Sequence, residues 1–205
     1  MNKTLLIDTM VFDVPKDAIT EAKNRSDNRF VVKGTVQRAD AKNQNGRIYP
    51  FDILTTEAKK YKDTYIKESR AMGELDHPDS SVINLNNVSH NILDLYWQGK
   101  DLVGVIEVLG TPSGNILKEL FKAGIKLGIS SRGLGSIKNE VDEGAQADYV
   151  QEDFELICWD FVSNPSTQGA FMAPIKEGVD RKTNTENVKW DKVSSIITEL
   201  LPELK

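Results

Sequence analysis

The sequence predicts a mainly β protein with peripheral helices, an α+β fold whose strands form a closed or nearly closed β-barrel. Two observations favour this class: strand-like segments outnumber helical ones, and they are spread along the chain without the regular alternation of a parallel α/β sheet. The chain has 205 residues, of which 39% are hydrophobic, so it can fill one ordinary core.

The predicted strands are runs of β-branched and aliphatic residues bounded by turn residues. Asn43-Gln44-Asn45-Gly46 predicts a turn after the first strand, and Gln98-Gly99-Lys100-Asp101 predicts a hairpin between the third and the fourth. Residues 1–28 show only a short apolar patch and are predicted to be irregular. The predicted strands are residues 29–37, 71–75, 88–97, 102–109, 125–131, 134–139 and 149–162.

Two helices are predicted within this β-rich part. Residues 52–68 carry apolar side chains near the helical period. Thr111-Pro112-Ser113-Gly114 is a helix-start signal for residues 115–123, and Gly124 ends that helix.

The character of the chain changes after Pro174. Residues 176–189 are polar without apolar periodicity, which predicts a linker, and residues 191–204 predict an amphipathic helix. The apolar stripe of this helix either packs on the body or binds a partner. We therefore expect one domain over residues 1–174 and a separable segment over residues 175–205.

Charge and cysteine content exclude several classes of function. The net charge of −5 gives no bulk attraction for a phosphate backbone, so we expect no nucleic-acid partner. Cys158 is the only cysteine, which excludes an internal disulfide and a thiolate zinc site and fits an intracellular setting. The N-terminal apolar stretch is too short for a signal peptide, and no segment predicts a membrane span. We expect no cofactor and no membrane association.

The chain has two histidines, so a serine–histidine mechanism must use one of them. His77 precedes Pro78, which disfavours helix and favours an extended residue at a strand end, where the ring can face a cleft. Spacing alone fits a surface histidine in a polar turn at least as well. His90 begins a strand among polar neighbours, and we expect it to be structural or solvent-facing.

Strand alternation distinguishes two adjacent serines. Leu127, Ile129 and Ser131 share the apolar face of the strand, which leaves Ser130 on the opposite face. Ser130 is therefore the serine that faces a cleft, and amides near Arg132 and Gly133 are candidates for an oxyanion hole. An ordinary strand that ends in a glycine turn remains an alternative interpretation.

A serine nucleophile needs a base that a third group orients. Asp160 follows Phe154, Leu156 and Cys158 on one predicted strand face, so it is a carboxylate in an apolar row and needs a partner if it is buried. An imidazolium, a lysine, an arginine or solvent at a strand end would each serve. Glu74 and Asp76 flank His77 and rank lower, because sequence neighbours rarely reach back to the ring.

Four blocks of sequence, in one order, resemble the prohead core proteases of large contractile-tailed phages. The resemblance implies a β-barrel ringed by helices, like that of the herpesvirus assemblins, with His77 as base and Ser130 as nucleophile. Asp160 matches the acid of its block, although related proteases have Glu or His there, and Asp76 departs from the expected Asn. The blocks are Asn45-Gly46-Arg47-Ile48-Tyr49-Pro50, Gly73-Glu74-Leu75-Asp76-His77-Pro78, Gly128-Ile129-Ser130-Ser131-Arg132-Gly133-Leu134-Gly135-Ser136 and Asp160-Phe161-Val162-Ser163-Asn164-Pro165-Ser166.

The resemblance also implies the substrates. A serine endopeptidase of this family cuts scaffold or core proteins and major capsid proteins inside the assembling prohead, in the host cytoplasm. Family members typically cleave after glutamate, with an aliphatic residue two positions before it and a small residue after it. Ile175-Lys176-Glu177-Gly178 fits this pattern, so we expect self-cleavage between Glu177 and Gly178. Arg132, Lys126 and Arg47 are candidate cations for a pocket that selects glutamate.

Two other classes remain open from the sequence. One is a non-catalytic scaffold or capsid-assembly protein that keeps a protease-like barrel. The other is a metal-dependent hydrolase that uses His77, Asp76 and His90, although these residues lack a helical His-x-x-x-His spacing. The sequence does not decide whether the chain forms a homo-oligomer.

Overall fold

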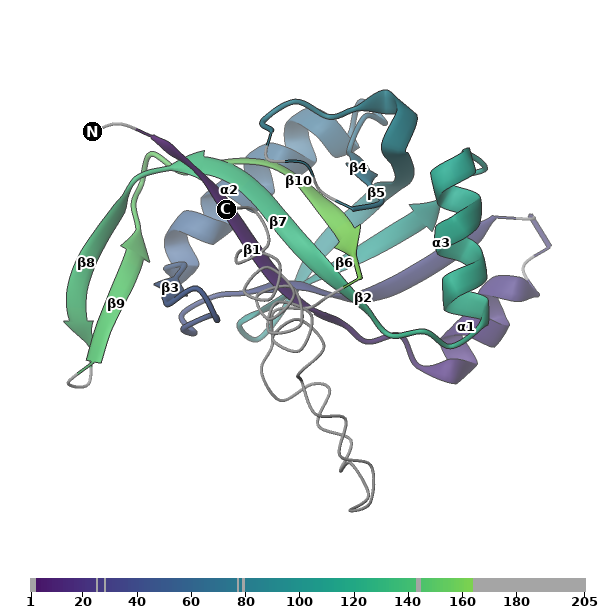
Figure 1. The fold of residues 1–205 in the computed structure, drawn as a ribbon, viewed down its shortest axis with the longest axis horizontal. Coiled ribbons are helices and arrows are strands. Elements are labelled where there is room, and N and C mark those ends of the chain that lie inside the picture. The colour runs from purple at the N-terminus through teal and green to yellow at the C-terminus, as the bar shows by residue number, and fades with distance from the viewer. Residues whose placement is uncertain are drawn as a thin grey trace, which may run out of the picture. The chain divides into compact units, whose positions relative to one another are not determined.

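The computed structural model describes residues 3–163 except 25, 28, 77, 79, 143 and 144. The predicted linker, the predicted helix over residues 191–204, Glu177, Gly178 and His77 lie outside the described residues. The elements, drawn in Figure 1, are β1 (Thr4–Phe12), α1 (Lys16–Lys23), β2 (Phe30–Arg38), β3 (Arg47–Ile48), α2 (Phe51–Tyr61), a π-helical turn (Lys62–Ile66), β4 (Met72–Glu74), a 3₁₀ turn (Leu85–Asn87), β5 (Val88–Gln98), β6 (Asp101–Val108), α3 (Pro112–Lys122), β7 (Leu127–Gly135), β8 (Ile137–Asp142), β9 (Ala145–Val150) and β10 (Glu155–Val162).

The mainly β class with peripheral helices is confirmed, but no closed barrel is found among the described residues. The strands form three sheets, with the orders β1-β7-β10, β2-β6-β5-β4 and β3-β9-β8. The first two sheets meet where Leu75 forms a parallel bridge with Phe161 and the Asp76 amide donates to the Phe161 carbonyl at 2.7 Å. On the other side β1 and β2 approach each other without pairing, so the ring of strands stays open at this seam.

The prediction that residues 1–28 are irregular is wrong. β1 pairs antiparallel with β7 over its whole length, and its inward positions include Leu6, Asp8 and Phe12. The buried Asp8 interrupts the apolar alternation and hides the strand from a pattern search. Its charge is compensated by residues about 40 positions further along the chain, which a local pattern cannot reveal.

Most other predicted elements are present with shifted ends. The β5–β6 hairpin turns at Gly99, which has a φ of 60°. α3 starts at Thr111, whose hydroxyl accepts the Gly114 amide at 3.0 Å, a capping interaction for one of the free amides at a helix start. The predicted strand over residues 149–162 is two strands, β9 and β10, separated by a turn in which the Phe154 amide donates to Gln151.

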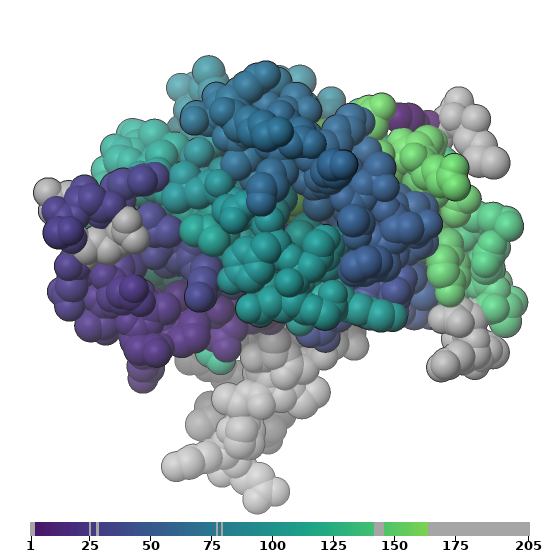
Figure 2. Space-filling view, turned by 180° about the vertical axis from the view of Figure 1, so that it is seen from behind, coloured from purple at the N-terminus to yellow at the C-terminus, as the bar shows by residue number. Residues whose placement is uncertain are grey.

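The core lies on one face of the β1-β7-β10 sheet. Phe161 of β10 makes edge-to-face contacts with Phe12 and Phe121, at centroid distances of 5.0 and 5.3 Å. Seen from behind, the surface is formed largely by the blue and teal segments, which include α2 and the β5–β6 hairpin (Figure 2). Within the described residues, no helix is long and apolar enough to cross a bilayer.

Candidate active site

Two adjacent serines on β7 face opposite sides of the sheet, as the alternation predicts. Ser131 lies on the core side, where its hydroxyl donates to the Asp8 carbonyl at 3.4 Å. Ser130 lies on the other side, fully buried, and its Oγ has no hydrogen-bond partner among the described residues. A buried hydroxyl without a partner is costly, so Ser130 is the serine whose position needs a functional explanation.

Asp160 lies directly opposite Ser130. The two residues are Cα partners in the antiparallel β7–β10 pair, so their side chains share one face with Cβ atoms about 5 Å apart. The register shifts between Leu156 and Cys158, which places an extra residue in β10 and turns Leu156 to the core side. The prediction that Leu156 shares the face of Asp160 is therefore wrong, whereas Cys158 does share it.

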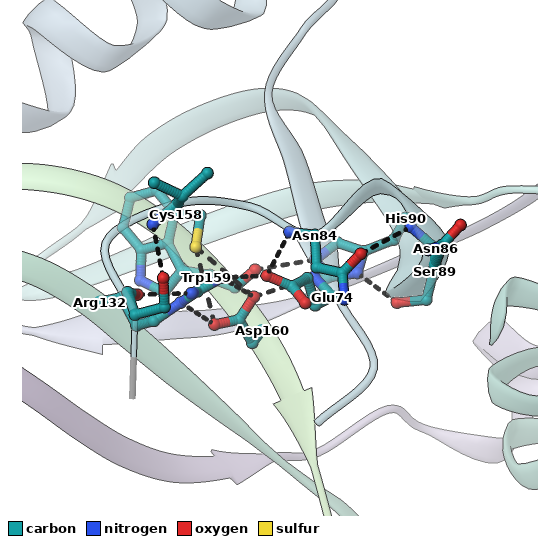
Figure 3. Close-up of polar contacts among 11 residues, drawn as sticks. Glu74, Asn84, Asn86, Ser89, His90, Arg132, Cys158, Trp159 and Asp160 are labelled. Carbon is teal, nitrogen blue, oxygen red and sulfur yellow. Dashed lines mark hydrogen bonds and ion pairs between the residues drawn. The ribbon is translucent and has the colours of Figure 1, made fainter. Parts of the chain in front are cut away.

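The Arg132 side chain is buried between two carboxylates (Figure 3). Its Nε lies 2.6 Å from Asp160 Oδ2, and its Nη2 donates to Glu74 Oε1 at 2.7 Å and to Asp160 Oδ1 at 3.2 Å. The ion pairs raise the pKa of Arg132 against the opposing effect of burial, and the guanidinium stays charged. With two carboxylates and one guanidinium, the cluster has a net charge of about −1.

The oxygens of this cluster are not equally satisfied. Asp160 Oδ1 accepts the Glu74 amide at 2.9 Å, and both of its oxygens lie within 3.6 Å of the Cys158 sulfur. Burial raises the pKa of the Asp160 carboxyl, while the Glu74 amide and Arg132 stabilise the ionised form. Burial and the Asp160 charge also raise the pKa of Cys158, which keeps the thiol protonated. Glu74 Oε2, in contrast, has no partner among the described residues.

His77 lies outside the described residues, but the chain on both sides of it is anchored to this cluster. On the preceding side, the Asp76 amide is bound to β10. On the following side, Arg132 Nη1 donates to the Ser80 carbonyl at 2.8 Å. Asp76 has a φ of 63°, a left-handed conformation that Asn and Asp tolerate better than most residues, so Asp is an acceptable replacement for the expected Asn.

His90 is structural. It is fully buried, its Nε2 lies 3.1 Å from the Trp159 carbonyl, and its Nδ1 lies 2.9 Å from Ser89 Oγ. Because a carbonyl only accepts, Nε2 carries the hydrogen and Nδ1 accepts from Ser89. Burial lowers the pKa of His90 to about 3, so the ring is neutral. Both nitrogens are occupied, which removes His90 from the metal-hydrolase alternative.

The first of the four sequence blocks, residues 45–50, binds the Asp8 carboxylate of the β1 strand. The side chains of Asn45, Arg47 and Tyr49 all donate to the Asp8 carboxylate, at 2.6 and 2.9 Å for the first two. Burial and the Asp8 charge raise the pKa of Tyr49, so the phenol remains a donor. The sequence analysis assigned only Arg47 of this block, as a candidate cation for a glutamate pocket, and missed its link to Asp8, although its polar residues recur at every second position, the spacing of one strand face.

The other predicted site residues have mixed surroundings. Gly133 lies inside β7, where an added Cβ would lie 2.3 Å from the Phe154 ring, so close packing explains this glycine. Two of the three candidate cations for a glutamate pocket already have carboxylate partners. Arg132 is paired with Glu74 and Asp160, and Arg47 is paired with Asp8 at 2.9 Å. Lys126 is exposed, and no ion pair is found for it among the described residues.

The sequence and the fold together place the chain in the class of phage prohead peptidases. The model of the family described as prohead core protein serine protease matches residues 9–180, and the chain belongs to that family. It is 31% identical to the prohead core protein protease of Enterobacteria phage T4 over 173 residues. This aligned region covers 83% of this chain and 80% of the relative. The solved structure of the bacteriophage T4 capsid assembly protease superposes with a TM-score of 0.68 at 27% identity, covering 79% of this chain and 99% of that one.

Proposed function

We propose that the chain is a serine endopeptidase in which Ser130 is the nucleophile, His77 the base and Asp160 the acid that orients the base. The observation that carries the proposal is the buried Ser130 hydroxyl, which has no hydrogen-bond partner among the described residues and lies directly opposite a buried carboxylate. Two described residues near His77 in the sequence support it: the Asp76 amide donates to Phe161, next to Asp160, and the Ser80 carbonyl accepts from Arg132. The net negative charge of the Glu74–Arg132–Asp160 cluster favours an imidazolium over a neutral ring.

The reaction proceeds through an acyl-enzyme. His77 takes the proton from the Ser130 hydroxyl as the oxygen attacks the scissile carbonyl, and donates it to the departing amine. Backbone amides of Arg132 and Gly133 are the proposed oxyanion donors. Water then attacks the ester, with His77 again as base. Asp160 stabilises the charged ring. Glu74, which has the one unpaired oxygen of the carboxylate pair, is the second candidate for direct contact with the imidazole.

The proposed substrates are the scaffold or core proteins and the major capsid protein of the immature phage head. Family membership supports cleavage inside the assembling prohead, in the host cytoplasm. Cleavage after glutamate needs a cation near the scissile bond, and Lys126 is the candidate for which the described residues offer no ion pair. Four residues at about 3.3 Å each place its Cα on the order of 13 Å from that of Ser130, which a lysine and a glutamate side chain together can bridge.

Self-cleavage is a further part of the proposal. Hydrolysis between Glu177 and Gly178 would release residues 178–205, with most of the predicted linker and the predicted helix, from residues 1–177, which contain the domain over residues 1–174. The competing function is that of a non-catalytic capsid-assembly protein with the same fold. The two functions differ in whether removal of the Ser130 hydroxyl abolishes an activity.

The test compares wild type, Ser130→Ala and the matched control Ser131→Ala on purified scaffold and capsid proteins, with fragments mapped by mass spectrometry. We expect Ser130→Ala to abolish cleavage, a loss of at least about 10³-fold, because the nucleophile is removed. Ser131→Ala removes hydrogen bonds of the core side, to the Asp8 carbonyl and with Tyr49, and should cut at the same sites. Intact mass should show loss of the tail after Glu177 in wild type and its retention in Ser130→Ala. An unchanged fragment pattern for Ser130→Ala would end the peptidase mechanism.

A further inference from the structure

The ring of strands has an open seam between β1 and β2. β1 is an edge of its sheet and β2 is an edge of the other. At one end the two strands touch, because a Cβ added to Gly34 would lie 2.8 Å from the Phe12 ring and 3.2 Å from the Asp13 carbonyl. Towards the other end they diverge, and the space between them is a cavity of about 270 Å³. It is lined from β1 by Asp8, Thr9 and Met10, from β2 by Val36, Gln37 and Arg38, and from the following segment by residues 41–44 and Tyr49.

Gln37 of this seam has a buried carboxamide without a partner among the described residues. The residue is one of those that line the cavity and is 7% exposed, and its Nε2 and Oε1 are both buried with no hydrogen bond found for either. A register shift between Thr35 and Gln37 interrupts the β2–β6 ladder here, the kind of irregularity that re-aims a side chain. A buried amide with both ends unpaired is expensive, so it indicates a ligand that has a donor and an acceptor.

The edge of β1 is occupied at Ile7 and free at Thr9 as far as the described residues show. The Ile7 carbonyl points away from β7, since it accepts from the side chains of Asn45 at 2.9 Å and Arg47 at 3.2 Å. Backbone groups of a strand repeat their direction every second residue, so the amide and carbonyl of Thr9 point the same way, into the seam. No hydrogen bond to them is found in the described part of the chain.

Two of the three charged side chains at the cavity have an ionic partner. Asp8 is paired with Arg47 and Arg38 with Asp101, while the Lys42 ammonium donates to the neutral Gln146 carbonyl. The groups of Gln37 and Thr9 that lack partners among the described residues are neutral, and they match the N–H and C=O of peptide units. Met10 and Val36 supply an apolar wall for a neighbouring side chain.

We infer that the β1–β2 seam binds an extended segment of the protein substrate, which adds a strand to β1 at Thr9 and presents a peptide group to the Gln37 carboxamide. Strand addition to a free edge is a common mode of peptide recognition. This inference rests on the proposed function, since it concerns how a proteolytic substrate is held. Thr9 is the Cα partner of Ser130, so the bound strand would run about two strand spacings, roughly 10 Å, from the nucleophile. The seam therefore engages residues several positions away from the scissile bond.

Binding to the full-length Ser130→Ala variant tests the inference separately from catalysis. The probe is a fluorescent 30-residue peptide that carries residues 163–192 of this chain and includes the proposed cleavage bond. We expect Gln37→Leu in this background to raise Kd about tenfold, as loss of well-made hydrogen bonds does. The control Gln98→Leu, at the exposed β5–β6 turn, should leave Kd unchanged. Hydrogen exchange should show new protection of the Thr9 amide in the complex.

A peptide N-methylated at consecutive residues gives a second measurement that does not depend on the folding of a Gln37 variant. It has lost the N–H donors on both of its edges, so it cannot pair with β1 as a strand and should fail to bind. Equal Kd values for Gln37→Leu and its parent, no protection at Thr9, or full binding of the methylated peptide would each overturn the inference. Residual cleavage by Ser130→Ala would overturn the proposed mechanism instead, and mass spectrometry of the same samples reports it.

Discussion

Two buried ionic clusters lie on opposite faces of the β1-β7-β10 sheet, and they differ in how completely they are satisfied. On the core face, the Asp8 carboxylate receives donors at both oxygens from Asn45, Arg47 and Tyr49. On the other face, the pair of Asp160 and Glu74 shares one guanidinium, and Glu74 Oε2 has no partner among the described residues.

The two adjacent serines follow the same division. Ser131 belongs to the satisfied side and Ser130 to the side with unpaired oxygens. A fully paired cluster fixes a strand and has no capacity left for chemistry, whereas free acceptors and a free hydroxyl can exchange a proton. Within one sheet, buried oxygens that lack partners among the described residues therefore distinguish the proposed reactive face from the structural one.

The largest effect on the reactive face is expected from Asp160→Asn. It removes the carboxylate opposite Ser130 and leaves Arg132 with a single charged partner, so kcat should fall by about 10³-fold. Glu74→Gln keeps the oxygen that Arg132 and Asn84 use, so about tenfold is expected. Steady-state kinetics on one peptide substrate measures both. A larger loss for Glu74→Gln would transfer the orienting role from Asp160 to Glu74.

A substitution in the Asp8 cluster, on the structural face, should lower the free energy of unfolding and leave kcat nearly unchanged. Asp8→Asn leaves Arg47 without its charged partner in a largely buried position, and we expect a loss of about 3 kcal/mol in the free energy of unfolding. Urea titration measures it, with Asp101→Asn in the exposed pair with Arg38 as a control that should cost less than about 1 kcal/mol. At temperatures where both variants are folded, kcat should stay within about threefold of wild type. A hundredfold fall in kcat for folded Asp8→Asn would erase the distinction between the two faces.

His90 supplies a smaller effect that depends on pH. Its pKa is about 3 in the folded protein against an ordinary value of 6.5, so the unfolded chain binds a proton that the folded chain refuses. Stability is therefore unaffected above pH 6.5 and falls as the pH decreases below it, by about 2 kcal/mol between pH 6.5 and pH 5.

Unfolding free energies of wild type and His90→Gln across this range provide the measurement. Gln can still donate to the Trp159 carbonyl but has no proton to gain, so its curve should be flatter. Parallel curves would show that His90 does not carry the acid sensitivity.

Most elements of the fold were predictable because their signals are local. Val88 to Gln98 and Asp101 to Val108 form a hairpin because apolar strands flank a glycine turn, and α3 begins where a Thr-Pro pair starts a helix. β1 was missed because the burial of Asp8 depends on partners in the segment around Arg47. The sequence left open whether the barrel is closed, because pairing across the β1–β2 seam depends on long-range geometry; among the described residues no closed barrel is found.

The site was predictable in part for the same reason. Alternation along β7 separated Ser130 from Ser131 without any tertiary information. It failed at Leu156, because one extra residue in β10 reverses the faces and bulges have no local pattern here. Sequence also identified Asp160 as a carboxylate that needs a partner, but left an imidazolium, a lysine and an arginine open.

By itself, the sequence determined which side chains share a strand face, because a period of two residues is a property of the extended backbone. Only the tertiary structure decided that Arg132 lies between Asp160 and Glu74, that Asp8 is neutralised by the block around Arg47, and that Gln37 is left unpaired in an open seam. Those outcomes depend on strands far apart in the chain meeting in one register, and the energy of a buried charge or amide is set by what that meeting brings within about 3 Å.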